Sequence, residues 1–345
     1  ASKVALSFWA VSGIVLGALK FVPQEKHKLK FPHWSDMVIL CKAMAQKTIA
    51  LLGNNKIQLI VIFCLAFYLR TYKINNPIAD WHSWRQADTA SVTRNYVRYG
   101  IDPLFPRYDD LSSVASGKPN PEGYRFVEFP LYNIASVVID KLVPDTIEHS
   151  SRLTSIFASM WSLIFLYFLV KKHSDQFTAK VAAFYFAVLP YNIYWSRVVL
   201  PEPTLVALCL GMIYFFNQWI DTEKKRYYIS SVLLAAAALL VKFTAIFFVI
   251  PMAYLVFRKW GWRAFLNPWM YVYGVAMVIP FILWRQHISY YPEGIPAYNW
   301  LFNGNGIRFK GAFFWWIFAD RIAKMILGGG GIVLLITGII TKTLD

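Results

Sequence analysis

Residues 227–257 read YYISSVLLAAAALLVKFTAIFFVIPMAYLVF, and Lys242 is the only charged side chain in this run. The run is longer than the roughly 20 apolar residues with which one helix crosses a bilayer. It lies between two Lys and Arg clusters, 224–226 and 258–263, and such clusters are typical of cytoplasmic linkers. The run must then cross an even number of times, so we expect two short segments, each of about 15 residues, with a turn near Lys242.

The composition agrees with a membrane protein. Hydrophobic residues make up 57% of the 345 residues, charged residues 16% and aromatic residues 18%, and the mean hydropathy is +0.42. The net charge of +16 is dispersed in short clusters between apolar runs, which indicates loops that face an anionic leaflet rather than nucleic acid binding. No Asn-x-Ser/Thr sequon occurs. We therefore predict an integral protein of a prokaryotic inner (cytoplasmic) membrane with membrane lipids, and no nucleic acid, as partners.

The apolar runs predict an all-α polytopic membrane protein, a transmembrane helix bundle with a long first extracytoplasmic loop that carries short surface helices. Beside 227–257, the predicted spans are 57–69 with its flanks, 152–170, 179–195, 203–220, 265–284 and 323–341. Basic linkers between them predict that 71–150, 191–202, the neighbourhood of Lys242 and 285–322 share the outer face.

The N-terminal part is predicted to be a separate extension. Residues 4–22 form an apolar segment that we interpret as a retained anchor, and 35–53 have the pattern of an amphipathic helix on the inner surface. We divide the chain into this extension, 1–55, and a transmembrane domain, 56–345.

The polar loop 71–150 is dense in aromatic residues, which predicts packed structure rather than disorder. Two surface helices are expected, Thr89–Tyr99 with Asp88 as N-cap and Leu131–Leu142 after Pro130.

Three carboxylates in this loop, Asp80, Asp88 and Glu128, are candidates for general-base chemistry or metal binding, with Arg85 among their expected partners. The alternative is that they are helix caps and salt bridges. Asp80 is the strongest candidate because nothing in the fold requires a charge beside two tryptophans. The spacing of the His residues does not match a metal site. Binding of a divalent ion by the three carboxylates remains an alternative, because carboxylates alone do not identify such a site.

The residues carry a resemblance to a known family. DWHSWRQADTA at 80–90, FVEFPLY at 126–132 and LPYNIYWSRVVLPEP at 189–203 resemble the GT-C membrane glycosyltransferases, in particular the group with the protein O-mannosyltransferases and the lipid A aminoarabinose transferase. The resemblance covers about 57–340 and rests on motif order. These enzymes are longer, so it also implies a further C-terminal region.

The resemblance implies an inverting transfer of a sugar from a polyprenyl-phosphate carrier to an acceptor hydroxyl of a glycan, lipid or protein at the extracytoplasmic face. The family's catalytic Asp maps onto Asp80. Its usual adjacent acidic pair is replaced here by WRQAD, so Asp88 is either a second catalytic acid or a cap. The family's E-x-P element maps onto Glu128 and Pro130, but Phe129 stands where the aminoarabinose transferase has a Lys.

A leaving carrier phosphate needs cationic donors, and Lys242, Arg197 and Arg285 fall on the predicted outer face. Lys242 is the first choice, against the alternative of a Lys that extends to the interface. Glu202, between two prolines, is a candidate for orienting the sugar or for helix N-terminal charge complementarity.

Two other functions compete with the transferase. A transporter of lipid-linked sugars would show internal repeats and charges in both halves, and neither is visible. A non-catalytic accessory subunit of a larger membrane complex would retain the fold, with 1–55 as its docking element.

Overall fold

The structure, a computed structural model, describes residues 54–298 and 303–344. The chain divides into two units between Asn55 and Lys56, and the anchor and amphipathic helix predicted before residue 54 lie outside the described residues. The second unit is helical in its described parts, with one isolated antiparallel bridge between Arg107 and Tyr124. The predicted all-α membrane fold class is confirmed.

The helices of this unit are α3 (Asn55–Arg70), α4 (Ser83–Tyr99), α5 (Leu131–Leu142), α6 (Ile147–His173), α7 (Gln176–Val188), α8 (Pro190–Trp195), α9 (Glu202–Thr222), α10 (Lys225–Val241), η1 (Phe243–Phe248), α11 (Val249–Trp260), η2 (Gly261–Leu266), α12 (Pro268–Ser289), η3 (Pro292–Gly294), η5 (Gly304–Phe309), α13 (Gly311–Trp315), η6 (Trp316–Ile326) and α14 (Gly330–Leu344).

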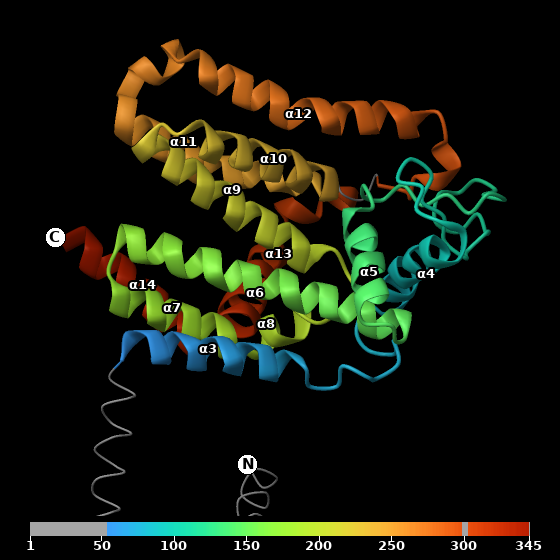
Figure 1. The fold of residues 1–345 in the computed structure, drawn as a ribbon, viewed down its shortest axis with the longest axis horizontal. Coiled ribbons are helices and arrows are strands. Elements are labelled where there is room, and N and C mark those ends of the chain that lie inside the picture. Colours follow the sequence, from blue (N-terminus) through green and yellow to red (C-terminus); the bar gives the residue numbers. More distant parts are fainter. Residues whose placement is uncertain (1–53, 299–302, 345) are drawn as a thin grey trace, which may run out of the picture. The chain divides into compact units, whose positions relative to one another are not determined.

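The long helices run side by side along the horizontal axis of Figure 1, and α4 and α5 lie together at one end of them. Within the described residues, three helical stretches are long and apolar enough to cross a membrane, namely Ile147–His173, Glu202–Thr222 and Phe243–Leu266, and a bent pair, Gly311–Ile326 with Gly330–Ile340, would make a fourth if it counts as one span. The turn from α11 through η2 into α12 lies at the end opposite α4 and α5 (Figure 1). The chain is therefore an integral membrane protein. The helices α4 and α5 of the loop 71–150 and the basic linker after α11 lie at opposite ends of its long helices (Figure 1).

The apolar block 227–257 divides where the sequence predicts. α10 ends at Val241, Lys242 has an extended backbone (φ −160°, ψ 127°), and η1 and α11 continue after it. The break is compensated by the outer loop, because the amide of Phe129 donates to the carbonyl oxygen of Leu240 at 3.0 Å. A helix end leaves carbonyl groups without partners, and this one is satisfied from outside the helix.

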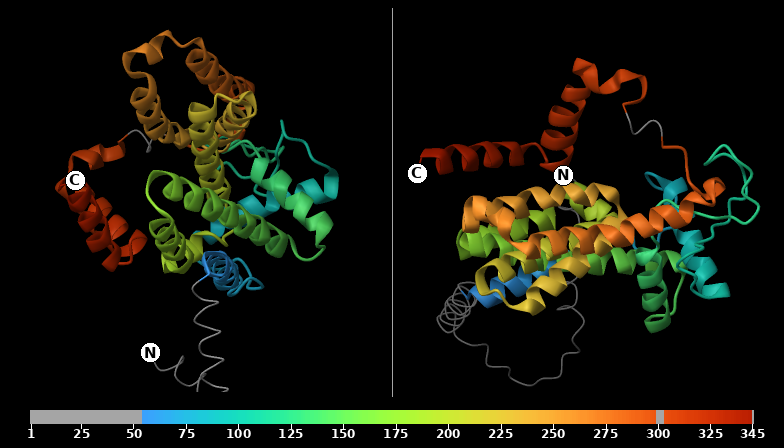
Figure 2. Two further views of the ribbon diagram at one scale, coloured as in Figure 1. Left: turned by 60° about the vertical axis from the view of Figure 1, so that its left-hand side comes forward. Right: turned by 90° about the horizontal axis from the view of Figure 1, so that it is seen from above.

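Three predictions about helix boundaries are wrong. The span expected at 179–195 is broken into α7 and α8 at Leu189, because a proline at 190 cannot donate the hydrogen bond that would continue α7. The span expected at 323–341 is instead η6 and α14, which meet at 104° (Figure 2). Gly328 and Gly329 make that turn with φ of 60° and 74°. The third error concerns the start of α4.

Helix α4 starts at Ser83, so Asp88 lies inside the helix and is not its N-cap. His82 takes the capping position instead, with φ 58° and no side-chain cap bond. The helical spacing at Thr89–Tyr99 predicted only the later part of α4. The side chains at the start of the helix contact segments distant in the sequence, so they do not follow that spacing. By contrast, α5 begins and ends where Pro130 and the apolar pattern predict.

Two buried arginines join the first helix and the start of the outer loop to the bundle. Arg70, at the end of α3, donates to the side chain of Ser159 (2.9 Å) and to the carbonyl oxygens of Ala187 and Phe186 (3.2 Å each). Arg152, in α6, donates to the carbonyl oxygen of Ile74 at 2.7 Å and to that of Asn76. Each guanidinium thus hydrogen-bonds to backbone carbonyl groups of a segment distant in the sequence.

The outer loop packs on the bundle through α4 and α5. Asn133 of α5 donates to the carbonyl oxygen of Thr89 (2.8 Å) and the hydroxyl of Thr93 (2.9 Å) in α4. Tyr132 donates to the carbonyl oxygen of Ser151 in α6 at 2.7 Å. Further along, the amide of Phe126 donates to the carbonyl oxygen of Gly294. The two residues are so close that a Cβ at position 294 would lie 2.4 Å from the Phe126 ring. Residues 126–130 are thus hydrogen-bonded to η3 through Phe126 and to α10 through Phe129.

We predict that Ser113 and Thr222, both exposed, lie on opposite sides of the membrane. In a variant without the native cysteines, a membrane-impermeant thiol reagent added outside intact cells should label Ser113→Cys and leave Thr222→Cys unlabelled until the membrane is permeabilised. The physical reason is that Thr222 adjoins the basic linker 224–226, which the positive-inside rule retains in the cytoplasm. Labelling of both from the same side would contradict this topology.

Candidate functional site

The carboxylate of Asp80 is fixed by a buried glutamine. Gln86, in the first turns of α4, is 0% exposed. Its Nε2 donates to Oδ1 of Asp80 at 2.7 Å and to the carbonyl oxygen of Trp81 at 2.9 Å. Its Oε1 accepts the backbone amide of Val199 at 3.0 Å. Asp80 is thereby tied to the segment before α9, although it forms no ion pair with any residue that the structure describes.

Aromatic side chains surround this carboxylate. The hydroxyl of Tyr194 donates to the carbonyl oxygen of Trp81 at 3.0 Å, and burial, followed by the charge of Asp80, raises the pKa of Tyr194. The ring of Trp195 lies 6.2 Å from that of Trp81 and 5.7 Å from that of His82. Indole and phenol rings beside a carboxylate form a wall with apolar faces and polar N–H and O–H edges.

A helix far along the chain closes one side of this wall. Arg321, in the π-helix η6, has its guanidinium carbon 5.7 Å from the ring centroid of Trp81 and 4.7 Å from that of Trp316. Such cation–π contacts contribute about 0.5–2 kcal/mol, depending on desolvation. They connect the C-terminal part of the described chain to the residue that follows Asp80.

Two cations and two carboxylates gather beside this region. Arg85 lies 3.2 Å from Oε1 of Glu202 and 3.9 Å from Oε1 of Glu128, and the Nζ of Lys242 lies 2.9 Å from the same Oε1 of Glu202. We call Arg85, Glu128, Glu202 and Lys242 the ion cluster. Its members come from α4, the loop before α5, the first residue of α9 and the break after α10. Oε2 of Glu202 is buried without a hydrogen-bond partner among the described residues.

Burial shifts the pKa of Glu128. The carboxyl is largely enclosed, and this burial raises its pKa, against the opposing effect of Arg85. A carboxyl with a raised pKa binds its proton more readily. As the pH falls and Glu128 is protonated, the ion cluster therefore keeps two cations, Arg85 and Lys242, but only one carboxylate, Glu202.

Asp88 belongs to a separate ion pair. Its Oδ2 lies 3.3 Å from Arg125, whose guanidinium carbon is 5.0 Å from the ring centroid of Tyr108. Burial raises the pKa of Asp88, and Arg125 acts in the opposite direction. The pair connects α4 to the loop that leads to Glu128.

The other two predicted cations lie apart from the ion cluster. Arg197 is largely buried, with its guanidinium carbon 5.5 Å from the ring centroid of Tyr194. It borders a cavity of about 450 Å³ between the end of α3 and α8, where Tyr68 and Tyr72 are also found. Arg285 is exposed on α12 and forms no ion pair within the described ranges.

The carboxylates do not converge as a set of metal ligands. Within residues 54–298 and 303–344, no three His, Cys, Asp or Glu side chains come close enough together to hold a metal ion. Asp80, Asp88 and Glu128 instead have three different partners, namely Gln86, Arg125 and Arg85.

Sequence reasoning missed the residues that position these groups. Gln86, Arg152, Tyr194 and Arg321 were not among the predicted site residues. Arg152 carried a usable signal, because a charge at the start of an apolar span is costly unless it has a partner. Gln86 and Arg321 carried none, since each also depends on a partner more than a hundred residues away along the chain, Val199 for Gln86 and Trp81 for Arg321.

Comparison with known proteins gives two kinds of match. A family model described as dolichyl-phosphate-mannose-protein mannosyltransferase matches residues 137–284, a range that includes Arg197, Glu202 and Lys242. No curated protein matches the chain.

Two crystal structures of ArnT from Cupriavidus metallidurans have the same fold. The structure bound to undecaprenyl phosphate matches with a TM-score of 0.53 at 15% identity, over 79% of this chain and 51% of ArnT. The apo structure matches with a TM-score of 0.54 at 15% identity, over 79% and 48%. The chain therefore spans about half the length of the ArnT chains it matches.

We predict that Gln86→Leu destabilises the protein by about 1–3 kcal/mol, because it leaves the buried amide of Val199 without a partner. Thermal unfolding in detergent, followed by circular dichroism, measures the change. Gln286→Leu is the matched control, since Gln286 is exposed on α12. Equal melting temperatures for the two variants would show that the Gln86 bridge contributes nothing to stability.

Proposed function

We propose that this chain, an integral membrane protein with the GT-C fold, transfers a sugar from a polyprenyl-phosphate donor to an acceptor hydroxyl at the extracytoplasmic face. The observation that carries the proposal is the position of Asp80, a carboxylate fixed by Gln86 and without an ion pair in the described chain. Segment 194–202 connects the surroundings of Asp80 to the ion cluster. Tyr194 contacts Trp81 and Val199 contacts Gln86, both beside Asp80, whereas Glu202 is a member of the ion cluster. The ArnT structure with undecaprenyl phosphate supports this class of donor.

Asp80 is proposed as the general base. A hydroxyl group is a weak nucleophile until its proton is removed, and a carboxylate within hydrogen-bond distance can accept that proton. A carboxylate paired with Arg or Lys is a poorer base, because the cation stabilises its ionised form. Asp80 accepts a hydrogen bond from the neutral amide of Gln86, which fixes its orientation without an ion pair to any described residue.

The ion cluster is proposed to bind the carrier phosphate. Arg85 and Lys242 share one oxygen of Glu202, and a protonated Glu128 leaves the cluster with a net charge of +1. An anion can then take the place of the missing carboxylate charge and receive hydrogen bonds from both cations. The buried Oε2 of Glu202, which has no hydrogen-bond partner among the described residues, is proposed to accept one from a sugar hydroxyl when the donor binds.

The reaction forms one bond and breaks one. The acceptor oxygen attacks the anomeric carbon from the face opposite the phosphate while its proton passes to Asp80. The bond from the anomeric carbon to the phosphate oxygen breaks, and the electron pair leaves with the polyprenyl phosphate. The products are a glycoside of inverted configuration and the free carrier phosphate, and Asp80 later releases its proton to water.

The remaining predicted residues receive supporting roles. Asp88, through Arg125, holds α4 against the loop that carries Glu128. Arg197 borders the cavity beside α3 and α8, which suits the lipid part of a carrier near its headgroup. Arg285, exposed on α12, is proposed as a contact to anionic lipid headgroups.

We predict that Asp80→Asn lowers transfer by about 10²–10⁴-fold, because asparagine keeps the size and the hydrogen bond of aspartate but accepts no proton. Transfer of radiolabelled sugar from polyprenyl phosphate in proteoliposomes measures the loss, and donor affinity should stay at the wild-type level. Asp221→Asn is the matched control, since Asp221 pairs with Lys172 far from Asp80 in the fold. Transfer that survives Asp80→Asn would reassign the base to Asp88 or Glu128, and a wild type that transfers from no polyprenyl-linked donor would favour an accessory subunit.

We also predict that Glu128 makes donor binding depend on pH. As the pH rises through the raised pKa of Glu128, its carboxyl ionises and cancels the net positive charge of the ion cluster. Binding of undecaprenyl phosphate should therefore weaken relative to that of Glu128→Gln, which stays neutral.

The measured quantity is the ratio of the two dissociation constants across pH, because the ionisation of the phosphate itself affects both proteins equally. The ratio of wild type to variant should rise with pH. A ratio that does not change with pH would show that Glu128 titrates outside the range tested or that the phosphate binds elsewhere.

A further inference from the structure

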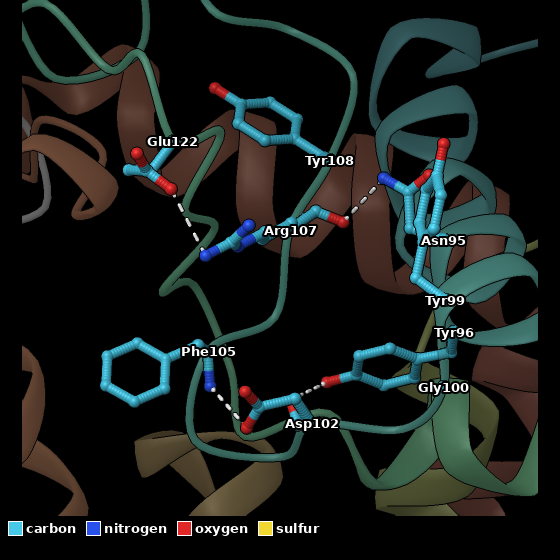
Figure 3. A pocket seen from close by; sticks show the side chains of 9 residues that line it. All are labelled: Asn95, Tyr96, Tyr99, Gly100, Asp102, Phe105, Arg107, Tyr108 and Glu122. Carbon is cyan, nitrogen blue, oxygen red and sulfur yellow. Dashed lines mark hydrogen bonds and ion pairs between the residues drawn. The ribbon is translucent and has the colours of Figure 1, made fainter.

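A cavity of about 460 Å³ opens at the far end of α4 from Asp80 (Figure 3). Aromatic rings of Tyr96 and Tyr99, at the end of the helix, and of Phe105 and Tyr108, in the following loop, line it. A helix rises 1.5 Å per residue, so the end of α4 at Tyr99 lies about 24 Å along its axis from Ser83. The cavity is therefore separate from the proposed reaction centre.

Hydrogen bonds fix the shape of this cavity. The hydroxyl of Tyr96 donates to the carbonyl oxygen of Asp102 at 2.8 Å, and the carboxylate of Asp102 accepts the amide of Phe105 at 3.2 Å. The amide of Tyr108 donates to the carbonyl oxygen of Gly123 at 2.8 Å. Gly123 has φ of 63°, and a Cβ there would lie 2.6 Å from the Tyr108 carbonyl oxygen, so the close approach of the two loop strands requires glycine.

Polar side chains alternate with the rings along the wall. Arg107 and Glu122 form an ion pair at 3.1 Å. The amide nitrogen of Asn95 donates to the carbonyl oxygen of Arg107 and to Oδ1 of Asp109, each at 3.1 Å. This geometry fixes the orientation of the Asn95 amide, and its Oδ1 makes no hydrogen bond with any described residue. Figure 3 shows these groups around one opening.

We propose that this cavity binds a neutral sugar unit of an extended glycan acceptor, at a distance from the hydroxyl that reacts. The identity of the glycan as acceptor rests on the proposed transferase function. A pyranose ring has apolar C–H faces, which pack on aromatic rings, and a rim of hydroxyl groups, which pair with amide, carboxylate and guanidinium groups. Tyr99 is the best placed ring for such stacking, because it is 83% exposed and lies beside Gly100, which adds no side chain.

The charges of the wall disfavour the other ligands of the proposed reaction. Asp102 and Glu122 carry two negative charges and Arg107 one positive charge, and Arg107 is already paired. A carrier phosphate would meet a net negative wall, so electrostatic repulsion opposes its binding. Binding energy from a remote sugar unit can still assist transfer, because it holds the acceptor in place for the reaction.

The first experiment measures binding without any donor. Isothermal titration calorimetry on the purified full chain uses neutral glucan, mannan and N-acetylglucosamine oligomers as probes. At least one probe should bind the wild type, and Tyr99→Ala should weaken that binding about two- to tenfold, the range expected for one aromatic contact. Tyr290→Ala is the matched control, because Tyr290 is an exposed tyrosine on another segment.

Three results would overturn the proposal: no probe binds, Tyr99→Ala binds as well as the wild type, or inorganic phosphate or a Ser- and Thr-rich peptide competes for the cavity in place of sugar. This experiment needs no catalysis, so it separates the cavity from the reaction. Failure of the wild type to transfer sugar would leave the binding result intact.

The second experiment compares a short and a long acceptor of the same repeating unit in the transfer assay. Tyr99→Ala should raise the KM for the long acceptor and leave kcat unchanged, because the cavity does not touch the reacting atoms. The short acceptor, which cannot span about 24 Å, should show no change. Equal effects on both acceptors would place Tyr99 in a structural role instead.

Discussion

The arrangement of the candidate site depends on the hydrogen bond from the amide of Phe129 to the carbonyl oxygen of Leu240. A membrane protein can interrupt a helix only where the freed backbone groups find other partners. Here the outer loop supplies the partner, and in doing so it brings Glu128 to the helix break at Lys242. Glu202 and Arg85 then complete the ion cluster around the break. The helix break and the ion cluster consequently meet at the same place, because Lys242 belongs to both.

Helix α4 coordinates the two halves of the site. Arg85 and Gln86 are neighbours in the sequence, about 100° apart around the helix axis, and they face different partners. Gln86 fixes Asp80, and Arg85 enters the ion cluster. The distance between the proposed base and the proposed phosphate site is thus determined by the rotation of one helix. Asn133, through Thr89 and Thr93, fixes that rotation against α5.

The parts of the fold that depend on local patterns could be predicted from the sequence. Pro130 and the apolar spacing after it give α5, and a lone Lys within a long apolar run gives the break at Lys242. The start of α4 could not be predicted, because its first turn is stabilised by Val199 through Gln86 rather than by a cap. For the candidate site, motif order indicated Asp80 and Glu128, and the single charge in a long apolar run indicated Lys242. Neither pattern showed that Glu128 and Lys242 belong to one cluster, or that Asp88 pairs with Arg125, because these contacts are formed only in the tertiary structure.

The bond between Gln86 and Val199 joins residues 113 positions apart, and this separation bears on how the chain is made. A ribosome adds about 5–20 residues per second, so Gln86 exists for on the order of ten seconds before its partner is synthesised. During that interval the side-chain oxygen of Gln86, which later accepts the amide of Val199, must find another partner such as water. The outer loop can therefore reach its final arrangement only after the segment before α9 has been inserted, and biosynthesis itself orders the assembly of the site.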